Sequence, residues 1–179
     1  MSNRIPLGIL ALQFWHEAAA YLRAAEILIH DEAEPGVVPP AYFLMSHGLE
    51  LLLKTYLLSR GDSYDDVGKL KHDIQAAYQR ACGLGLMVTG DHVEALVEKL
   101  SEFHTAQVFR YPIVRRDDGR LVIRGHLVRP TEVFQIIESF AAKIQGPALF
   151  ARIEAARDGE FRIETWHMGL PPVSDERGR

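Results

Sequence analysis

Apolar residues recur every three or four positions through most of this chain, which is the pattern of amphipathic helices. Glycine and proline punctuate the pattern, as in Gly61 after the second run and Gly146-Pro147 late in the chain. Helices are predicted over residues 5–30, 39–60, 72–84 and 91–105, and a fifth begins at Pro130. We expect Gly146-Pro147 to break this last helix, with a further turn or two to Ala156, and residues 61–71 to form a polar loop.

Two helix starts carry capping residues. Asp73 stands just before the third apolar run, where a carboxylate suits the positive end of a helix. Asp91 is followed by Glu94 three residues later, which is the spacing of a capping box at the start of the fourth helix.

The periodicity changes after Phe109. Residues 111–116 and 120–124 flank Asp117-Asp118-Gly119, which is typical of a three-residue hairpin turn. Pairing about that turn places Arg116, Arg120 and Arg124 on one face. The predicted fold is therefore mainly α: an antiparallel bundle of about five helices with an inserted β-hairpin near residues 111–125. We expect one domain over residues 1–157 and a tail over 158–179.

Composition fits this picture. The chain has 179 residues, 47% hydrophobic and 25% charged, so it can build one hydrophobic core without a disulfide or a structural metal. The single cysteine, Cys82, has no partner within the chain. Met1 to Leu12 lacks the pattern of a signal peptide, and polar residues interrupt the apolar runs, so no membrane span is predicted and a cytoplasmic location is expected.

Charge is unevenly distributed along the chain. Between Arg110 and Arg129 six arginines stand against Asp117 and Asp118, a net charge of +4, although the whole chain carries −4 and its remainder therefore −8. Two interpretations remain open for Arg115, Arg116, Arg120 and Arg124. They form a solvated hairpin that contacts the acidic helices, or they bind RNA or another acidic partner.

The second helix holds the most informative side chains. It is apolar on nearly all sides, which indicates a buried central helix. His47, Glu50 and Lys54 are set into that surface at spacings of three and four, so they share one face. This stripe is either the helix's narrow solvent-exposed edge or the site of the protein's chemistry.

Two later segments add candidates. Leu70-Lys71-His72-Asp73-Ile74 offers His72, which either caps the third helix, a role that Asp73 suits better, or reaches inward. Phe109-Arg110-Tyr111-Pro112 places Arg110 between aromatic residues, where a guanidinium can pair with a buried carboxylate. The predicted helices contain no Glu-x-x-His motif of a di-iron bundle, so we predict neither a metal site nor a cofactor.

Three segments, 46–54, 70–74 and 109–112, resemble a bacterial branch of the HEPN superfamily, in element order over roughly residues 10–145. The resemblance implies a small helical bundle, commonly a homodimer, linked to RNA binding or cleavage in toxin–antitoxin and defence systems. Catalytic members typically carry an arginine followed, four to six residues on, by a histidine. After Arg110 no histidine stands at those offsets, and the Arg120–His126 match falls in the predicted hairpin.

Three functional hypotheses follow. The first is a HEPN-like binding or regulatory module, RNA-associated and non-catalytic. The second is a metal-independent endoribonuclease, with His47, His72 or His104 as acid–base group and Arg110 steadying the phosphate. The third is a structural module that holds a partner protein. As a separate hypothesis, we expect Glu50 and Arg110 to meet, with His47, Lys54 and His72 close by.

Overall fold

The computed structural model describes residues 5–30, 38–107, 115–117, 120–122 and 129–158. The part of the chain so described is mainly helical, as predicted. Its helices are α1 (Leu7–His30), α2 (Val38–Ser59), α3 (Tyr64–Lys69), α4 (Ile74–Gly83), α5 (Val93–Thr105) and α6 (Pro130–Asp158). None of the helices in these residues is both long and apolar enough to cross a bilayer.

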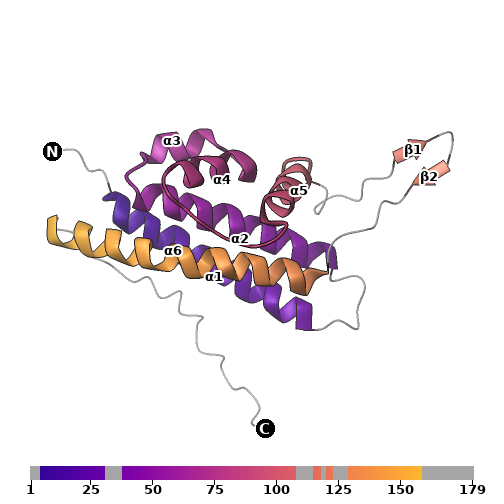
Figure 1. Cartoon of the computed structure of the whole chain (residues 1–179), viewed down its shortest axis with the longest axis horizontal. Coiled ribbons are helices and arrows are strands. Elements are labelled where there is room, and N and C mark those ends of the chain that lie inside the picture. The colour runs from indigo at the N-terminus through magenta and orange to yellow at the C-terminus, as the bar shows by residue number, and fades with distance from the viewer. Residues whose placement is uncertain (1–4, 31–37, 108–114, 118–119, 123–128, 159–179) are drawn as a thin grey trace, which may run out of the picture.

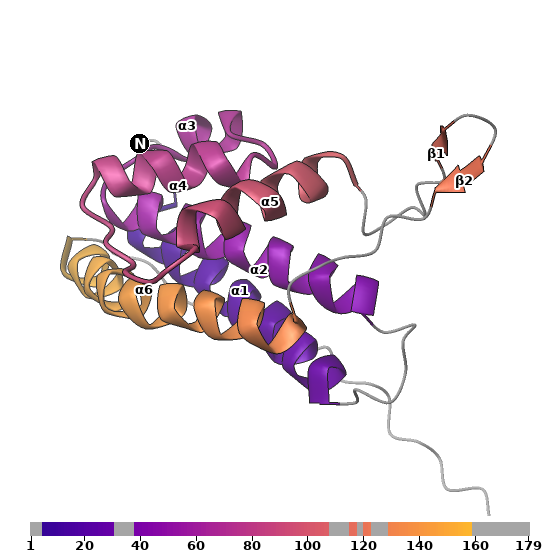
Figure 2. The same cartoon turned by 45° about the vertical axis from the view of Figure 1, so that its right-hand side comes forward.

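Helix α2 is the centre of the molecule. Fourteen of its 22 residues are buried, which explains why its sequence is apolar on nearly all sides. The other five helices all surround and contact it (Figures 1 and 2). The polar residues set into α2 are therefore surrounded by protein.

Helices α1 and α6 pack against each other and against α2, and α1 runs antiparallel to both (Figure 1). Small residues permit this close packing. A Cβ atom on Gly8 would lie 2.0 Å from the carbonyl oxygen of Ala151, and one on Gly48 would lie 2.8 Å from a methyl carbon of Leu22. Gly8 thus lets α1 approach the backbone of α6, and Gly48 lets the backbone of α2 approach a side chain of α1.

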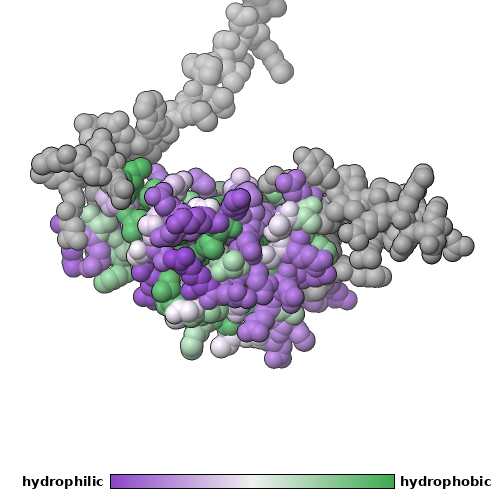
Figure 3. Space-filling model, turned by 90° about the horizontal axis from the view of Figure 1, so that it is seen from above, coloured by the Kyte–Doolittle hydropathy of each residue, from purple (hydrophilic) through white to green (hydrophobic). Residues whose placement is uncertain are grey.

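The shorter helices α3, α4 and α5 cover the opposite side of α2, and their outer surface is mostly hydrophilic (Figure 3). The predicted polar loop over residues 61–71 is wrong, because it contains α3. Ser63 caps this helix by accepting a hydrogen bond from the Asp66 amide, Asp65 and Asp66 lie in its first turn, and Val67 is buried. Six residues are too few for the apolar periodicity that reveals a longer helix.

Two predicted helix boundaries also need correction. Helix α5 begins at Val93, after His92 in a left-handed conformation (φ 69°) that makes no side-chain capping bond, so Asp91 is not its cap. Helix α6 continues through Pro147 instead of breaking there. Ile144 and Ala148, on either side of that position, are both buried, so packing outweighs the hydrogen bond that proline removes.

Two short strands, β1 (Arg115–Asp117) and β2 (Arg120–Val122), pair antiparallel between α5 and α6. The register pairs Arg116 with Leu121 and Asp117 with Arg120. The predicted turn over residues 117–119 is wrong in one respect, because Asp117 belongs to β1 and pairs with Arg120. The rest of the predicted 111–125 hairpin, and the tail from residue 159, lie outside the described residues.

Candidate functional site

Glu50 is the focus of a buried polar cluster. It lies in the middle of α2 with 2% of its surface exposed. His47 and Lys54 stand one turn before and one turn after it, and both are largely buried. The interpretation of this stripe as a solvent-exposed helix edge is therefore wrong.

Lys54 anchors one oxygen of the carboxylate. Its Nζ donates to Glu50 Oε1 at 2.6 Å and to the backbone carbonyl of Lys71 at 2.6 Å. The same ammonium thus fixes the carboxylate and ties α2 to the turn between α3 and α4.

Three imidazoles surround the other oxygen. His104 Nε2 lies 2.8 Å from Glu50 Oε2, His72 Nδ1 lies 3.3 Å from it, and His47 Nδ1 lies 3.6 Å away. The first two distances are hydrogen bonds and the third is longer than one. Among the described residues, His47 Nδ1 is buried and has no hydrogen-bond partner.

Hydrogen bonds between α4 and α5 hold two of these histidines in place. Asp73 accepts from the Ala76 amide and so caps α4, as predicted. The same Oδ1 atom accepts from Ser101 Oγ of α5, which in turn accepts from the Gln75 amide. This connection fixes His72, just before α4, relative to His104, near the end of α5.

The carboxylate is ionised in this setting. Burial raises the pKa of the Glu50 carboxyl, but the contacts with His104, His47 and Lys54 outweigh it and hold the pKa well below its usual range. His104 Nε2 must then be the donor in its 2.8 Å contact, since an ionised carboxylate only accepts.

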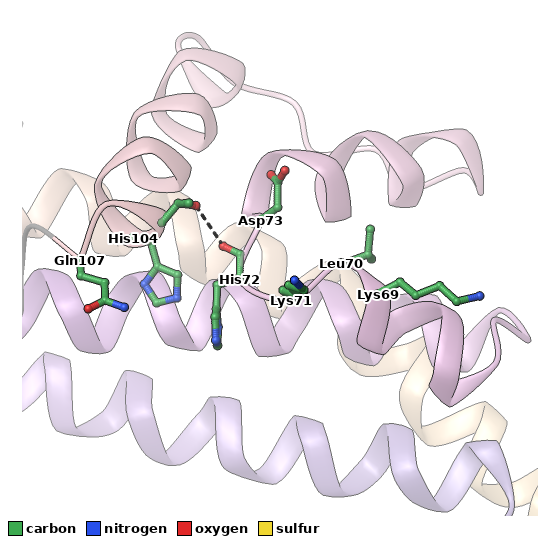
Figure 4. Close-up of a pocket in the computed structure, with 8 residues that line it drawn as sticks. Lys69, Leu70, Lys71, His72, Asp73, His104 and Gln107 are labelled. Atoms are coloured by element: carbon green, nitrogen blue, oxygen red, sulfur yellow. Dashed lines mark hydrogen bonds between the residues drawn. The ribbon is translucent and has the colours of Figure 1, made fainter.

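A cavity of about 400 Å³ opens beside the cluster. Figure 4 shows His72 and His104 with their rings directed toward α2, and Lys69 at the far end of the lining. Lys69 is paired with Asp66 at 2.7 Å, whereas the ammonium of Lys71 has no ion pair within the described part of the chain. The lining consists of Lys69, Leu70, Lys71, His72, Asp73, His104, Thr105 and Gln107.

The structure thus brings together four of the five predicted candidates, His47, Glu50, Lys54 and His72. The fifth, Arg110, lies outside the described residues, so its contact with Glu50 stays a prediction. Arg115 and Arg116 belong to β1 and Arg120 to β2, but their side chains, and Arg124 altogether, also lie outside.

His104 has a more central place than the sequence indicated, since it makes the shortest imidazole contact with Glu50. It comes from a helix 54 residues further along the chain. One signal was available: His104 falls on the apolar face of α5, four residues after Leu100, and both are buried. A histidine on the buried face of a helix needs a polar partner inside the protein.

In comparisons with known proteins, no protein-family model, curated protein or solved structure matches the chain.

Proposed function

We propose that this chain is a HEPN-like, RNA-associated binding or regulatory module of a bacterial defence or toxin–antitoxin type system. The bound segment of RNA would lie in the cavity beside His72 and His104. The observation that carries the proposal is the lining of that cavity, where Lys71 presents an unpaired ammonium among the described residues next to two imidazoles. Cationic and imidazole groups are the usual partners of phosphate oxygens.

Arg110 extends the same argument. Gln107 lines the cavity. Arg110 follows it by three residues in the sequence and lies outside the described residues, so its contribution to the cavity is part of the proposal. A guanidinium there would contact Glu50 or a phosphate of the bound RNA.

The proposal is tested with a single-stranded RNA oligonucleotide whose binding is followed by fluorescence anisotropy at several salt concentrations. Lys71→Ala should weaken binding and lower the slope against the logarithm of salt by about one, because one phosphate contact is lost. Lys143→Ala, an exposed lysine of α6, is the matched control. Equal behaviour of the two variants would remove the cavity from the proposal, and absence of RNA binding by the parent protein would favour a structural partner-binding module.

An endoribonuclease that needs no metal is the second candidate, favoured by the Glu50–His104 pair. A buried carboxylate that orients an imidazole is the arrangement used to hold a general base in position. The rings of His72 and His104 are 5.8 Å apart between centroids and border one cavity, so they suit the roles of base and acid at one phosphodiester.

This candidate predicts cleavage of RNA in the presence of a metal chelator and its loss in His72→Ala. His72 is the better variant because its side chain is 63% exposed, so the substitution leaves the core intact. An exposed histidine outside the site, His92, provides the control. Intact RNA after prolonged incubation with the parent protein would exclude this candidate and leave the binding module.

A further inference from the structure

The donor atoms of Glu50 and two neighbouring histidines are arranged as in a metal site. His47, Glu50 and His104 each offer one ligand atom, and these three atoms all lie within 4.8 Å of one another. Donor atoms in a tetrahedral zinc site with bonds of about 2.0–2.1 Å stand about 3.3 Å apart. The distances from Glu50 Oε2 to the nitrogens of His104 and His47, 2.8 and 3.6 Å, lie on either side of that value.

His47 supplies an independent reason. Its Nδ1 atom is buried and finds no hydrogen-bond partner among the described residues. A buried polar atom without a partner is costly, so it needs an explanation. The ring is also held in place, since Phe43 stacks on it and Tyr21 meets it edge-on at 4.5 Å between centroids. A fixed imidazole whose buried nitrogen makes no hydrogen bond within the described residues is suited to bind a metal ion.

The surroundings of the carboxylate support the same assignment. Lys54 occupies Oε1 and leaves Oε2 directed to the imidazoles. Carboxylate ligands of metals are commonly held by such an outer hydrogen bond. The negative carboxylate would stand between the ammonium and a bound ion, which reduces the repulsion between the two cations.

We propose that His47, Glu50 and His104 form a site for a divalent transition-metal ion, with zinc as the best fit. When the ion binds, the proton that His104 Nε2 donates to Glu50 would be released to solvent, which leaves that nitrogen free as a ligand. Two histidines and a glutamate are a known zinc ligand set that leaves a fourth position open. A further imidazole, that of His72, lies 3.3 Å from Oε2 at the border of the cavity. The ligands come from α2 and α5, so no local sequence motif announces them.

The test is titration of tag-free, metal-stripped protein with zinc chloride in a calorimeter. The expected result is one zinc ion per chain, with binding weakened at least 10-fold in His47→Ala, since even the loss of an outer partner costs about 10–100-fold. His16→Ala removes an exposed histidine of α1 and should bind as the parent does. Magnesium should not compete, because imidazole ligands favour zinc over magnesium.

His47→Ala is the preferred variant because the ring nitrogen that it removes makes no hydrogen bond in the described part of the protein. Histidine ring signals in an NMR spectrum give a second measurement that needs no variant. Those of His47 and His104 should shift on addition of one equivalent of zinc, while those of His16 and His92 stay in place. No binding, binding unchanged in His47→Ala, or shifts confined to exposed histidines would overturn the proposal. None of these measurements involves RNA, so their outcome is independent of the proposed function.

Discussion

At the scale of single residues, Glu50 holds a negative charge in the interior of the protein, so it needs partners there. In the described region three imidazoles and the ammonium of Lys54 lie next to its carboxylate. The same ammonium also donates to the carbonyl of Lys71. Buried charges are tolerated when they are paired and become costly when one partner is lost. The carboxylate therefore contributes to the fold as well as to the candidate site.

Replacement of Glu50 by alanine should lower the free energy of unfolding by about 3–5 kcal/mol, because Lys54 and His104 would remain buried without their partner. Urea denaturation in the presence of a chelator measures this without any contribution from metal. Glu102→Ala, which removes an exposed ion pair with Lys99, should change the same quantity by no more than about 0.5 kcal/mol. Similar losses in the two variants would show that the cluster does not stabilise the protein.

The sequence predicted much of this cluster and missed one part of it. His47, Glu50 and Lys54 could be placed together because a single helix fixes their spacing. His72 could be named but not oriented, since it follows Lys71, whose backbone has a positive φ of 50° that periodicity cannot reveal. The central position of His104 depends on how α5 packs against α2, which is a tertiary property.

At the scale of whole elements, α1 comes close to the backbone of α6 at Gly8. Gly8→Ala should destabilise the protein by about 1–3 kcal/mol or more, because the new methyl group would overlap the backbone of Ala151. Backbone atoms move aside less easily than the end of a side chain. Gly83→Ala is the control: nothing lies within 4 Å of the position that its new methyl group would take, so it should be neutral or slightly stabilising in α4. Thermal unfolding of both variants checks the prediction. A stabilised Gly8→Ala protein would contradict the observed packing.

The paired strands carry a second prediction at this scale. If RNA is the partner, simultaneous replacement of Arg116, Arg120 and Arg124 by alanine should weaken binding. The slope of log affinity against log salt should also fall by up to about three, because up to three phosphate contacts are lost. The control replaces three exposed arginines of the helices, Arg23, Arg152 and Arg157. Unchanged affinity and salt slope in the first variant would assign the arginines to the solvated hairpin of the alternative interpretation.

The long helices were predictable and the local boundaries were not. Apolar periodicity over twenty or more residues predicted α1 and α2 to within two residues, because burial of one face dominates their stability. The start of α5 and the continuity of α6 through Pro147 depend on single backbone conformations and on packing. The free-energy differences that set these boundaries are small, and they depend on neighbours that are distant in the sequence.

For the whole molecule, the expected homodimer needs a surface through which two chains could meet. The large apolar side chains Phe14, Trp15 and Tyr21 of α1 do not provide one, because they pack partly buried against the core. Exposed apolar side chains instead gather late in α6, at Leu149, Phe150 and Ile153. Contiguous exposed apolar surface is typical of association between proteins.

The homodimer stays a prediction, now with a testable surface. Light scattering at micromolar concentration should give twice the mass of one chain, and Phe150→Asp should give a monomer, because a charge at the interface would be buried without a partner. Ile27→Asp, at an exposed apolar residue of α1, should leave the mass unchanged. A monomer in the parent protein would contradict the prediction.

The contact between α1 and α6 also has a consequence for synthesis of the chain. Residues of α1 and α2 leave the ribosome before those of α6. The last residue of α6 follows the end of α2 by 99 positions, so the faces of α1 and α2 that pack against α6 stay uncovered until those residues are made. At about 5–20 residues per second this interval lasts roughly 5–20 seconds. During that time α1 and α2 lack their contacts with α6, among them the contact of Gly8 with Ala151. The nascent chain therefore exposes a chaperone-accessible surface that the finished protein no longer presents.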